Sequence, residues 1–545
     1  MLQKDIIKKI ENYLNKEKEF VNLDFSKLSL FTPKNIAHGD FSTNFALIIA
    51  SELKINPNEL ANKITSTLLK RKDKFFDKIE VAKPGFINFT ISKEVYQNLL
   101  KRINQLGNKF GSSKKNKKRV LIEFVSANPT GFLHVGHLRN AAVGDSISRI
   151  LSFSGYEVTN EYYLNDYGGQ IKLLGESLQS RVYKILGVDK EMPEGGYQGE
   201  YLVDLAKILT TKKEKRFLLK SEIKYFSNVA TDYFTKEIKK DLEPLNISFD
   251  SWFSEKKDIH ESRYLDKVKR LLDSKNGIYF QDNAEWIKTS EFGDDKDWVI
   301  KKSDGNSTYF MNDIAYHQNK FEREFDLIVN VWGADHHSHI SRLKASMNLL
   351  SNQTEKLVFV LIQFVRLVRD NKDVSMSKRS GTYITIKDLL KEFDSDLVRF
   401  LMISRSSDTH FDFDFDKCKS NSEENPVFYI QYANARINSI LKKSPLDQWN
   451  FKNVLLLNED KEINLIKRLL NFTEIVSESA ENLAPHKIAF YLQELASEFH
   501  AYYKSTKVLV EDDKILNGRL ILLSSIKMVL INGLNLLGVS SPDKM

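Results

Sequence analysis

A short apolar run, followed by a turn-rich loop and an amphipathic helix, constrains the fold of this chain most strongly. The run is Val120-Leu121-Ile122, and the loop includes Ser126-Ala127-Asn128-Pro129-Thr130-Gly131. The helix that follows places four apolar residues on one face: Val143, Ile147, Ile150 and Leu151. Short unbroken apolar runs are typical of buried parallel strands, and residues 327–329 and 357–362 form two more. This order predicts a Rossmann-type, doubly wound α/β sheet.

The chain has 545 residues, and chains divide into several domains once a core grows past roughly 250–300 residues. Residues 1–110 combine helical patterns, one with Leu2, Ile6, Ile10 and Leu14 on one face, with two short strands at 78–81 and 86–89 around Pro84-Gly85. We expect an α+β domain there. Residues 111–405 would form the doubly wound catalytic domain, with a helical insertion at about 165–300. Residues 406–545 follow a helical period, with Gly538 fitting a helix C-cap, and predict an all-α bundle.

Composition excludes several classes of protein. No apolar run reaches the ~18 residues of a membrane span, and the N-terminus lacks the layout of a secretion signal. The single cysteine, Cys418, excludes an internal disulfide framework and a thiolate metal cluster. A cytoplasmic enzyme without membrane contact is the simplest interpretation. The net charge of +8 suggests a polyanion such as nucleic acid as a partner, and the lysine-rich segment 112–119 is either a solvated linker or part of such a surface.

The residues His134-Val135-Gly136-His137 lie where the loop turns into the helix. A helix N-terminus attracts phosphate through its unpaired N–H groups and its dipole. Histidines at a spacing of three can both point toward that phosphate, and Gly136 leaves room for a flat base. The alternative is a pair of ordinary surface histidines near a turn.

A second segment, Ser375-Met376-Ser377-Lys378-Arg379-Ser380-Gly381, predicts a small polar loop well downstream. Lys378 would present a point charge to the β- and γ-phosphates as pyrophosphate leaves. Together the two segments resemble the His-Ile-Gly-His and Lys-Met-Ser-Lys-Ser signatures of class I aminoacyl-tRNA synthetases. Ser375 replaces the first lysine of the second signature and Arg379 its last serine, so another cation must share the phosphate charge, and Arg379 is one candidate.

Longer blocks narrow the resemblance to the arginyl-tRNA synthetases, over essentially the whole chain. These blocks are residues 123–139, 309–317, 332–337 and 376–381. The resemblance implies that His134, His137 and Lys378 are catalytic. It also implies an ATP site made of Asn128, Pro129, Thr130, Gly131, His134, Gly136, His137, Ser377 and Lys378.

The same resemblance implies an arginine pocket. Asp313 and Tyr309, four residues apart on one helix face, would hold the guanidinium, whose planar donors require carboxylates and neutral acceptors. Glu123, Ser126 and Asn128 would position the α-amino and carboxylate groups, and His336 is a further contact. Without the resemblance, Asp313 would be interpreted as an ordinary exposed helix acid.

The resemblance also implies contacts to tRNA at both ends of the chain. Phe86 and Asn88 would meet the D-loop, with the alternative that Phe86 is core and Asn88 a turn residue. Tyr432, Tyr503 and Met545 would contact the anticodon arm, although each residue type is also common in helix cores.

The implied reaction ligates L-arginine to tRNA(Arg) through an arginyl-adenylate, in a monomer, with Mg²⁺ accompanying ATP. No structural metal is expected: His336, His337 and His339 need not converge, and Asp412, Asp414 and Asp416 alternate with Phe411, Phe413 and Phe415, as in a packed extended segment. Two other functions stay open, a different adenylating or nucleotidyl-transfer enzyme and a catalytically inactive RNA-binding paralogue.

Overall fold

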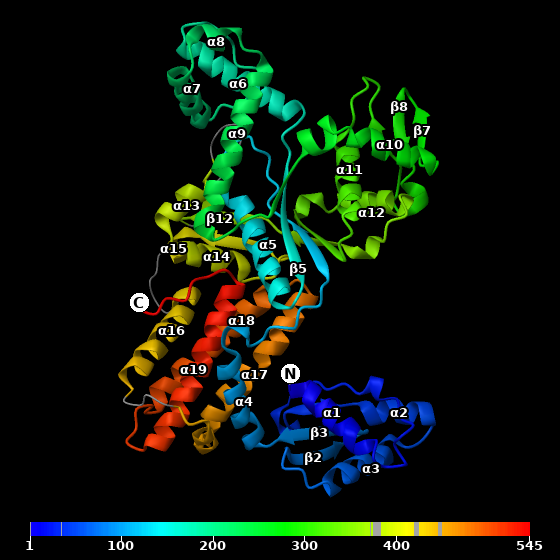
Figure 1. Cartoon of the computed structure of the whole chain (residues 1–545), viewed down its shortest axis with the longest axis vertical. Coiled ribbons are helices and arrows are strands. Elements are labelled where there is room, and N and C mark those ends of the chain that lie inside the picture. Colours follow the sequence, from blue (N-terminus) through cyan, green and yellow to red (C-terminus); the bar gives the residue numbers. More distant parts are fainter. Residues whose placement is uncertain (1, 34, 371, 374–382, 419–424, 445–448) are drawn as a thin grey trace.

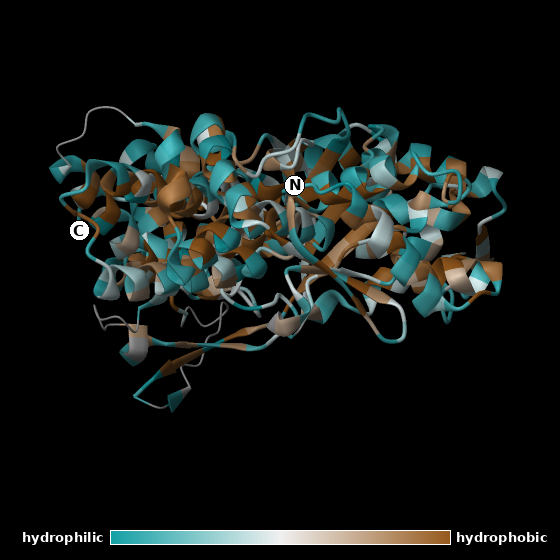
Figure 2. Cartoon of the chain, turned by 90° about the horizontal axis from the view of Figure 1, so that it is seen from below, coloured by the Kyte–Doolittle hydropathy of each residue, from teal (hydrophilic) through white to brown (hydrophobic). Residues whose placement is uncertain are grey.

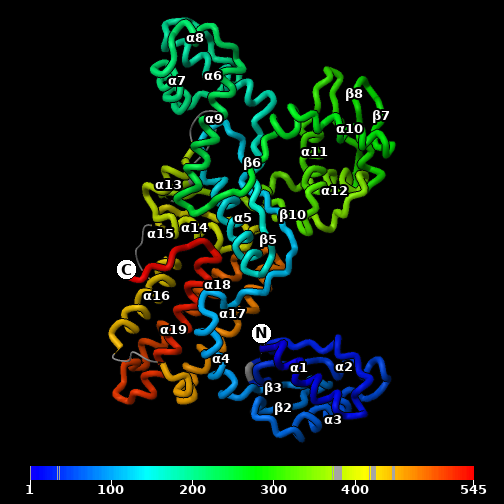
Figure 3. The backbone as a smooth tube through the Cα atoms, in the orientation of Figure 1, coloured from blue at the N-terminus to red at the C-terminus, as the bar shows by residue number. Residues whose placement is uncertain are grey.

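A computed structural model describes residues 2–33, 35–370, 372–373, 383–418, 425–444 and 449–545. The predicted loop with Ser377, Lys378 and Arg379 lies outside these residues. The chain is elongated, and the N-terminal domain and the α6–α9 helices lie at opposite ends of its long axis (Figure 1; Figure 3).

The centre of the molecule is a five-stranded parallel sheet with the strand order β11-β10-β4-β5-β6. Its strands are β4 (Arg119–Glu123), β5 (Glu157–Leu164), β6 (Ser251–Ser254), β10 (Leu327–Gly333) and β11 (Leu357–Ile362). The chain builds from β4 outward to β6 and then returns to the other side of β4 with β10. The predicted doubly wound sheet is therefore confirmed, and its order reverses between β4 and β10.

Helix α5 (Val135–Phe153) follows β4 and packs against the sheet. Its predicted apolar face is buried, with Val143, Ile147 and Ile150 each 1% exposed. Gly144 lets this helix approach the loop after β4, because a Cβ there would lie 2.4 Å from Cγ of Phe124. The position of α5 is thus fixed by close packing at its middle.

The prediction of one mostly helical insertion at about 165–300 is wrong in part. Helices α6 (Gly169–Ile185), α7 (Glu200–Lys212), α8 (Lys215–Lys220) and α9 (Ile223–Leu242) form one unit, which ends before β6 joins the central sheet. Helix α10 (Tyr264–Ser274) then precedes an antiparallel sheet of β7 (Ile278–Gln281), β8 (Ala284–Ile287) and β9 (Trp298–Lys301). Each of these strands is four residues long and includes one polar or charged residue, so each is too short to show a clear strand pattern in the sequence.

Two helices lie beside the β10 side of the sheet, α11 (Tyr309–Glu322) and α12 (His339–Leu349). A smaller unit follows β11. It contains β12 (Val365–Arg369), β13 (Lys372–Asp373), α13 (Ile386–Glu392), α14 (Ser395–Ile403), β14 (Phe411–Asp414) and α15 (Phe415–Cys418). Phe411 and Phe413 are buried on β14 while Asp412 is exposed, which confirms the predicted alternation.

The N-terminal domain contains α1 (Leu2–Leu14), β1 (Phe41–Thr43), α2 (Phe45–Leu53), α3 (Pro57–Lys70), β2 (Phe76–Ala82) and β3 (Phe86–Ile91). The two predicted strands pair antiparallel as β2 and β3, and the four predicted apolar residues of α1 are all buried. Helix α4 (Lys93–Leu106) instead packs on the C-terminal helices, where Gln97 donates to the Leu457 carbonyl at 2.8 Å. Helix α4 therefore belongs structurally to the bundle.

The C-terminal region is the predicted helical bundle of α16 (Pro426–Lys443), α17 (Asp460–Glu481), α18 (His486–Ser505) and α19 (Asp513–Leu536). Its helices carry hydrophobic and hydrophilic residues on the same turns (Figure 2). Among the described helices, α19 alone is long and apolar enough to cross a membrane, but 72% of that stretch is buried in the bundle. Gly538 follows α19 with a positive φ of 66°, as the C-cap prediction requires.

Candidate functional site

The loop after β4 is held in an unusual backbone conformation. Val125 and Ser126 have positive φ values of 65° and 41°, which costs free energy for residues with a side chain. Two contacts hold the loop: Val125 N–H donates to Oδ1 of Asn140 at 2.6 Å, and Ser126 Oγ accepts from the Tyr163 N–H at 3.1 Å. This conformation lies at the carboxyl end of β4, at the sheet's switch point, where open α/β sheets bind ligands.

The rings of the two histidines lie close together, tilted by 31°, at the start of α5. Their ring centroids are 3.7 Å apart, and each ring accepts a backbone N–H: His134 Nδ1 from Gly136 at 3.1 Å, and His137 Nδ1 from His134 at 3.2 Å. These bonds leave the Nε2 atoms as the ring donors. A Cβ at Gly136 would lie 2.8 Å from Cε1 of His134, so this glycine makes room for the histidine ring itself.

A cavity of about 520 Å³ lies over this helix start. It is lined by residues from the β4 loop, from α5 and from the carboxyl ends of β10 and β11. The predicted site residues that line it are Ser126, Asn128, Thr130, His134, Gly136, His137 and His336. Pro129 and Gly131 lie in the same loop but are not among its lining residues, and Ser377 and Lys378 lie outside the described residues.

The second part of the site is an acidic cluster beside α11. Burial and the charges of Glu255 and Glu123 raise the pKa of Asp313 to about 7, against the opposing effect of Arg342 and Lys320. Carboxylates held together with too few cations favour the binding of another cation. A guanidinium, which stays charged at any physiological pH, would relieve this repulsion.

Sequence reasoning missed Glu255. This carboxylate follows β6 and is 2% exposed, where it accepts hydrogen bonds from Tyr163 Oη and Asn312 Nδ2, both at 2.7 Å. It begins a π-helical turn over residues 255–261, a conformation found frequently at functional sites. The π-turn has no simple sequence signature, so a Glu in a Lys- and Asp-rich stretch gave no signal.

Glu123 is buried at the end of β4 and is paired inside the protein. Its Oε2 receives a hydrogen bond from Nζ of Lys320 at 2.6 Å, and Lys320 is 0% exposed. Lys320 also donates to Oδ1 of Asn330 at 2.7 Å. One oxygen of Glu123 is thereby committed to an internal cation, which fixes the orientation of the carboxylate.

The remaining predicted arginine contacts border this cluster. Tyr309 begins α11, one turn before Asp313, and is 61% exposed. Asn128 donates to Gln170 Oε1 at 2.7 Å, and His336 is exposed beside Asp335. Ser126 joins the two parts of the site, because its Oγ bonds Tyr163 and the hydroxyl of Tyr163 bonds Glu255.

The two predicted tRNA contacts in the N-terminal domain differ in accessibility. Asn88 is 8% exposed, and its amide is used by Ser42 Oγ at 2.7 Å and by Nδ1 of His38 at 3.4 Å. Phe86 is partly buried and packs edge-on against Phe31, which is 41% exposed. Asn88 lies within β3 and not in a turn, and its buried amide already has partners inside the domain.

Aromatic side chains gather on one face of the bundle, with Arg436 between two of them. The guanidinium carbon of Arg436 lies 4.4 Å from the ring of Tyr432 and 4.9 Å from the ring of Tyr503. Tyr432 also stacks with Phe428 and His500. We call Phe428, Tyr432, Arg436, His500 and Tyr503 the aromatic surface. Met545 is 52% exposed and lines a neighbouring cavity that also contacts Phe428.

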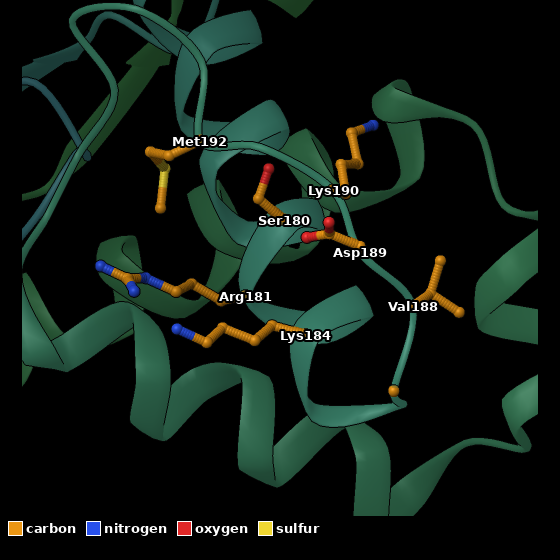
Figure 4. Close-up of a pocket in the computed structure, with 8 residues that line it drawn as sticks. Ser180, Arg181, Lys184, Val188, Asp189, Lys190 and Met192 are labelled. Atoms are coloured by element: carbon orange, nitrogen blue, oxygen red, sulfur yellow. The ribbon is translucent and has the colours of Figure 1, made fainter.

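Another cavity, of about 390 Å³, lies between α6 and the segment that follows it. Arg181 and Lys184 lie side by side there, with Asp189 across from them (Figure 4). Its lining residues are all different from those of the histidine-lined cavity.

Comparison with known families assigns all three parts of the chain. Residues 2–91 match the arginyl-tRNA synthetase N-terminal domain, residues 96–404 match the catalytic domain of class I (R) tRNA synthetases, and residues 430–545 match the DALR anticodon-binding domain.

Whole proteins agree with these matches. A relative from Listeria monocytogenes named arginine–tRNA ligase is 42% identical over the full length of both chains, and one from Staphylococcus carnosus is 41% identical over 94% of each. A crystal structure from Campylobacter jejuni, described as an arginyl-tRNA synthetase, has 35% identity and a TM-score of 0.77, and covers 84% of this chain and 100% of that one. Thermus thermophilus arginyl-tRNA synthetase shares the fold over both full lengths, with a TM-score of 0.78 at 22% identity. The chain belongs to the arginyl-tRNA synthetase family.

Proposed function

We propose that this chain ligates L-arginine to tRNA(Arg), using ATP and passing through an arginyl-adenylate. One observation carries the proposal: a buried acidic cluster is joined, through Tyr163 and Ser126, to a histidine-lined cavity at the switch point of the sheet. The acidic cluster suits a guanidinium, and the helix start suits phosphate.

In the first step the arginine carboxylate attacks the α-phosphorus of ATP, and pyrophosphate leaves. The phosphates would meet the positive end of the α5 dipole and the Nε2 donors of His134 and His137 as negative charge develops. Thr130, Asn128 and Gly136 line the same cavity and would contact the nucleotide. The proposed ATP site also includes Pro129, Gly131, Ser377 and Lys378, on the basis of the family resemblance.

The substitution Lys378→Ala should lower kcat. The expected loss of transition-state stabilisation is roughly 2–4 kcal/mol.

Arginine would lie with its guanidinium between Asp313 and Glu255, with Tyr309 at the mouth of the pocket. Glu123 is oriented by Lys320, so its second oxygen could accept the substrate's α-ammonium group. Ser126, Asn128 and His336, which line the adjoining cavity, would position the carboxylate toward ATP. The enzyme then works mainly by holding two reactants in line.

We propose that Mg²⁺ arrives with the ATP phosphates. The described residues contain no group of three His, Cys, Asp or Glu side chains placed to hold a metal ion. Mg²⁺ is commonly held through substrate phosphates with few protein ligands, so the nucleotide itself would supply its main ligands.

In the second step a terminal ribose hydroxyl of the tRNA attacks the activated carbonyl, and AMP leaves. Tyr432 and Tyr503 on the aromatic surface, with Met545 beside it, would contact the anticodon arm, since exposed rings flanked by arginine stack well on bases. Phe86 and Asn88 would meet the D-loop. Of the predicted domains 1–110, 111–405 and 406–545, the first and the last share elements with their neighbours, because α4 packs on the bundle and β14 pairs with β12. We propose that the chain works as a monomer located in the cytoplasm.

The decisive experiment is ATP–pyrophosphate exchange with tRNA present, repeated across all amino acids. Exchange that depends on arginine alone is expected. Exchange with a different amino acid would overturn the substrate assignment. A complete absence of exchange, in protein that still binds tRNA, would favour an inactive RNA-binding paralogue.

A further inference from the structure

One buried arginine joins three distant parts of the chain. Arg399, on α14, is 1% exposed. Its Nε donates to the Leu537 carbonyl at 2.5 Å, its Nη1 donates to the Leu245 carbonyl at 2.6 Å, and its Nη2 pairs with the carboxylate of Asp145. A single planar guanidinium therefore contacts the end of α19, the turn after α9 and the middle of α5.

These partners give the contact a defined physical role. Leu537 caps the C-terminus of α19, where carbonyls lack helical partners and favour a cation. Gly538 is required next to it, because a Cβ there would lie 2.3 Å from Nη2 of Arg399. Removing a buried partner from such a charge pair is costly, so α5, α14 and α19 must move together.

The same short helix also contacts the helix that carries the aromatic surface. Asp396 lies one turn before Arg399 on α14, and its Oδ2 accepts a hydrogen bond from Nε2 of Gln431 at 2.8 Å. Gln431 is 7% exposed and immediately precedes Tyr432 on α16. Asp396 Oδ1 also receives the N–H of Ser540 at 3.0 Å. Helix α14 is thus bonded to α16 through its first turn and to α5 through Arg399, one turn later.

Helix α5 is the element that carries the histidines. Asp145 lies ten residues after Val135, which is about 15 Å along a straight helix. Two bonds anchor the first half of this helix: Asp145 pairs with Arg399, and Asn140 accepts the N–H of Val125 in the β4 loop. A displacement at Asp145 would therefore reach the histidine pair without passing through a flexible segment.

We propose that Arg399 is a positioning residue that couples occupation of the aromatic surface by tRNA to the placement of His134 and His137. This inference rests on the proposed function of both surfaces. Rigid elements bonded in sequence can carry a coupling free energy, but the coupling must be measured rather than read from contacts. Arg399 touches no substrate, so its effect would appear in kcat and not in the KM for arginine or ATP.

The test compares arginylation of tRNA(Arg) with arginylation of the same tRNA carrying a substituted anticodon. In Arg399→Lys, kcat with the cognate tRNA should fall about tenfold while kcat with the substituted tRNA stays the same, so the ratio of the two falls about tenfold. Tyr432→Ala should raise the KM for tRNA both in the unmodified chain and in the Arg399→Lys variant. It should lower kcat only where Arg399 is present. An equal loss with both tRNAs would overturn the coupling and leave a structural role only.

Arg139→Lys is the matched control. Arg139 is also buried on α5, but its guanidinium donates to the carbonyls of Gln363, Ser406 and Thr409, none of which lies in the bundle. Arg139→Lys should lower kcat equally with the cognate tRNA and with the anticodon-substituted tRNA. A fall in the ratio of these two kcat values in this variant would also overturn the proposal.

Asp396→Asn serves as a second variant should Arg399→Lys not fold, since Asp396 is only partly buried. It should reduce the ratio by about threefold, and an unchanged ratio in this variant would equally overturn the coupling. A wild-type chain without arginine-dependent ATP–pyrophosphate exchange would refute the proposed function itself. This result differs from failure of the coupling, in which exchange is present and only the ratio of the two kcat values is unchanged.

Discussion

The two halves of the site differ in how they are built. The phosphate side consists of two histidines three residues apart, each of which accepts a backbone N–H within the first turn of α5. The amino-acid side brings Glu123, Glu255 and Asp313 together from β4, from the turn after β6 and from α11, and ties them to a fully buried lysine. Phosphate binding here is a local property of a helix start, whereas selection of a guanidinium depends on long-range packing of charge.

Lys320→Met should give the largest effect, because it leaves Glu123 buried without its cation. We expect the free energy of unfolding of the catalytic region to fall by about 4 kcal/mol, measured by urea denaturation. Lys267→Met on the exposed Lys267–Glu322 pair should cost less than about 1 kcal/mol. The double variant Lys320→Met with Glu123→Gln should recover part of the loss, and a double variant as unstable as the single one would show that charge is not the cause.

The substitution Asp313→Asn should have the second-largest effect. This substitution removes one of the two carboxylates proposed to face the guanidinium. The KM for arginine should rise more than a hundredfold, which corresponds to about 3 kcal/mol of lost binding free energy. The KM for ATP should change less than about twofold in the same exchange assay. Glu322→Gln, at the far end of α11, is the control and should change neither. Equal effects on both substrates would contradict the separation of the two halves.

His137→Asn tests the phosphate side. Loss of one ring donor should lower kcat for exchange by about 2 kcal/mol, roughly thirtyfold, with the KM for arginine unchanged. The fold should be unaffected, because Asn can still accept the His134 N–H. A rise in the KM for arginine without loss of kcat would mean that the histidine belongs to the amino-acid side.

The smallest effect is a pH dependence confined to the amino-acid side. Since the pKa of Asp313 is raised to about 7, this carboxyl becomes protonated as the pH falls below 7 and loses its attraction for the guanidinium. The KM for arginine should rise up to tenfold per pH unit between about 7 and 5.5, or about 1.4 kcal/mol per unit, and level off above pH 8. The Asp313→Asn variant should lack this dependence. A flat profile in the unmodified chain would argue that Asp313 stays ionised.

Local patterns predicted much of the fold. Unbroken apolar runs predicted the strands β4, β10 and β11. A helical period predicted α1 and α5, and a Pro-Gly turn between two strand patterns predicted the β2–β3 hairpin. The sequence predicted one mostly helical insertion where the structure has the helices α6–α9 and the strands β7–β9, because a four-residue strand is too short to show a two-residue period. The edge strand β6 was missed for the same reason.

The sequence by itself determined the parts whose chemistry lies within a few neighbouring residues. Residues within one or two helical turns of each other specify the helix start with His134 and His137 and the end of α19 at Gly538. Local patterns likewise specify the order of most strands and helices. The tertiary structure alone decided the rest: that Glu255 joins Asp313, that Lys320 occupies one oxygen of Glu123, and that Arg399 links α5 to the bundle. A buried charge is stable only beside its partners, and here those partners lie between about 60 and 250 residues away along the chain.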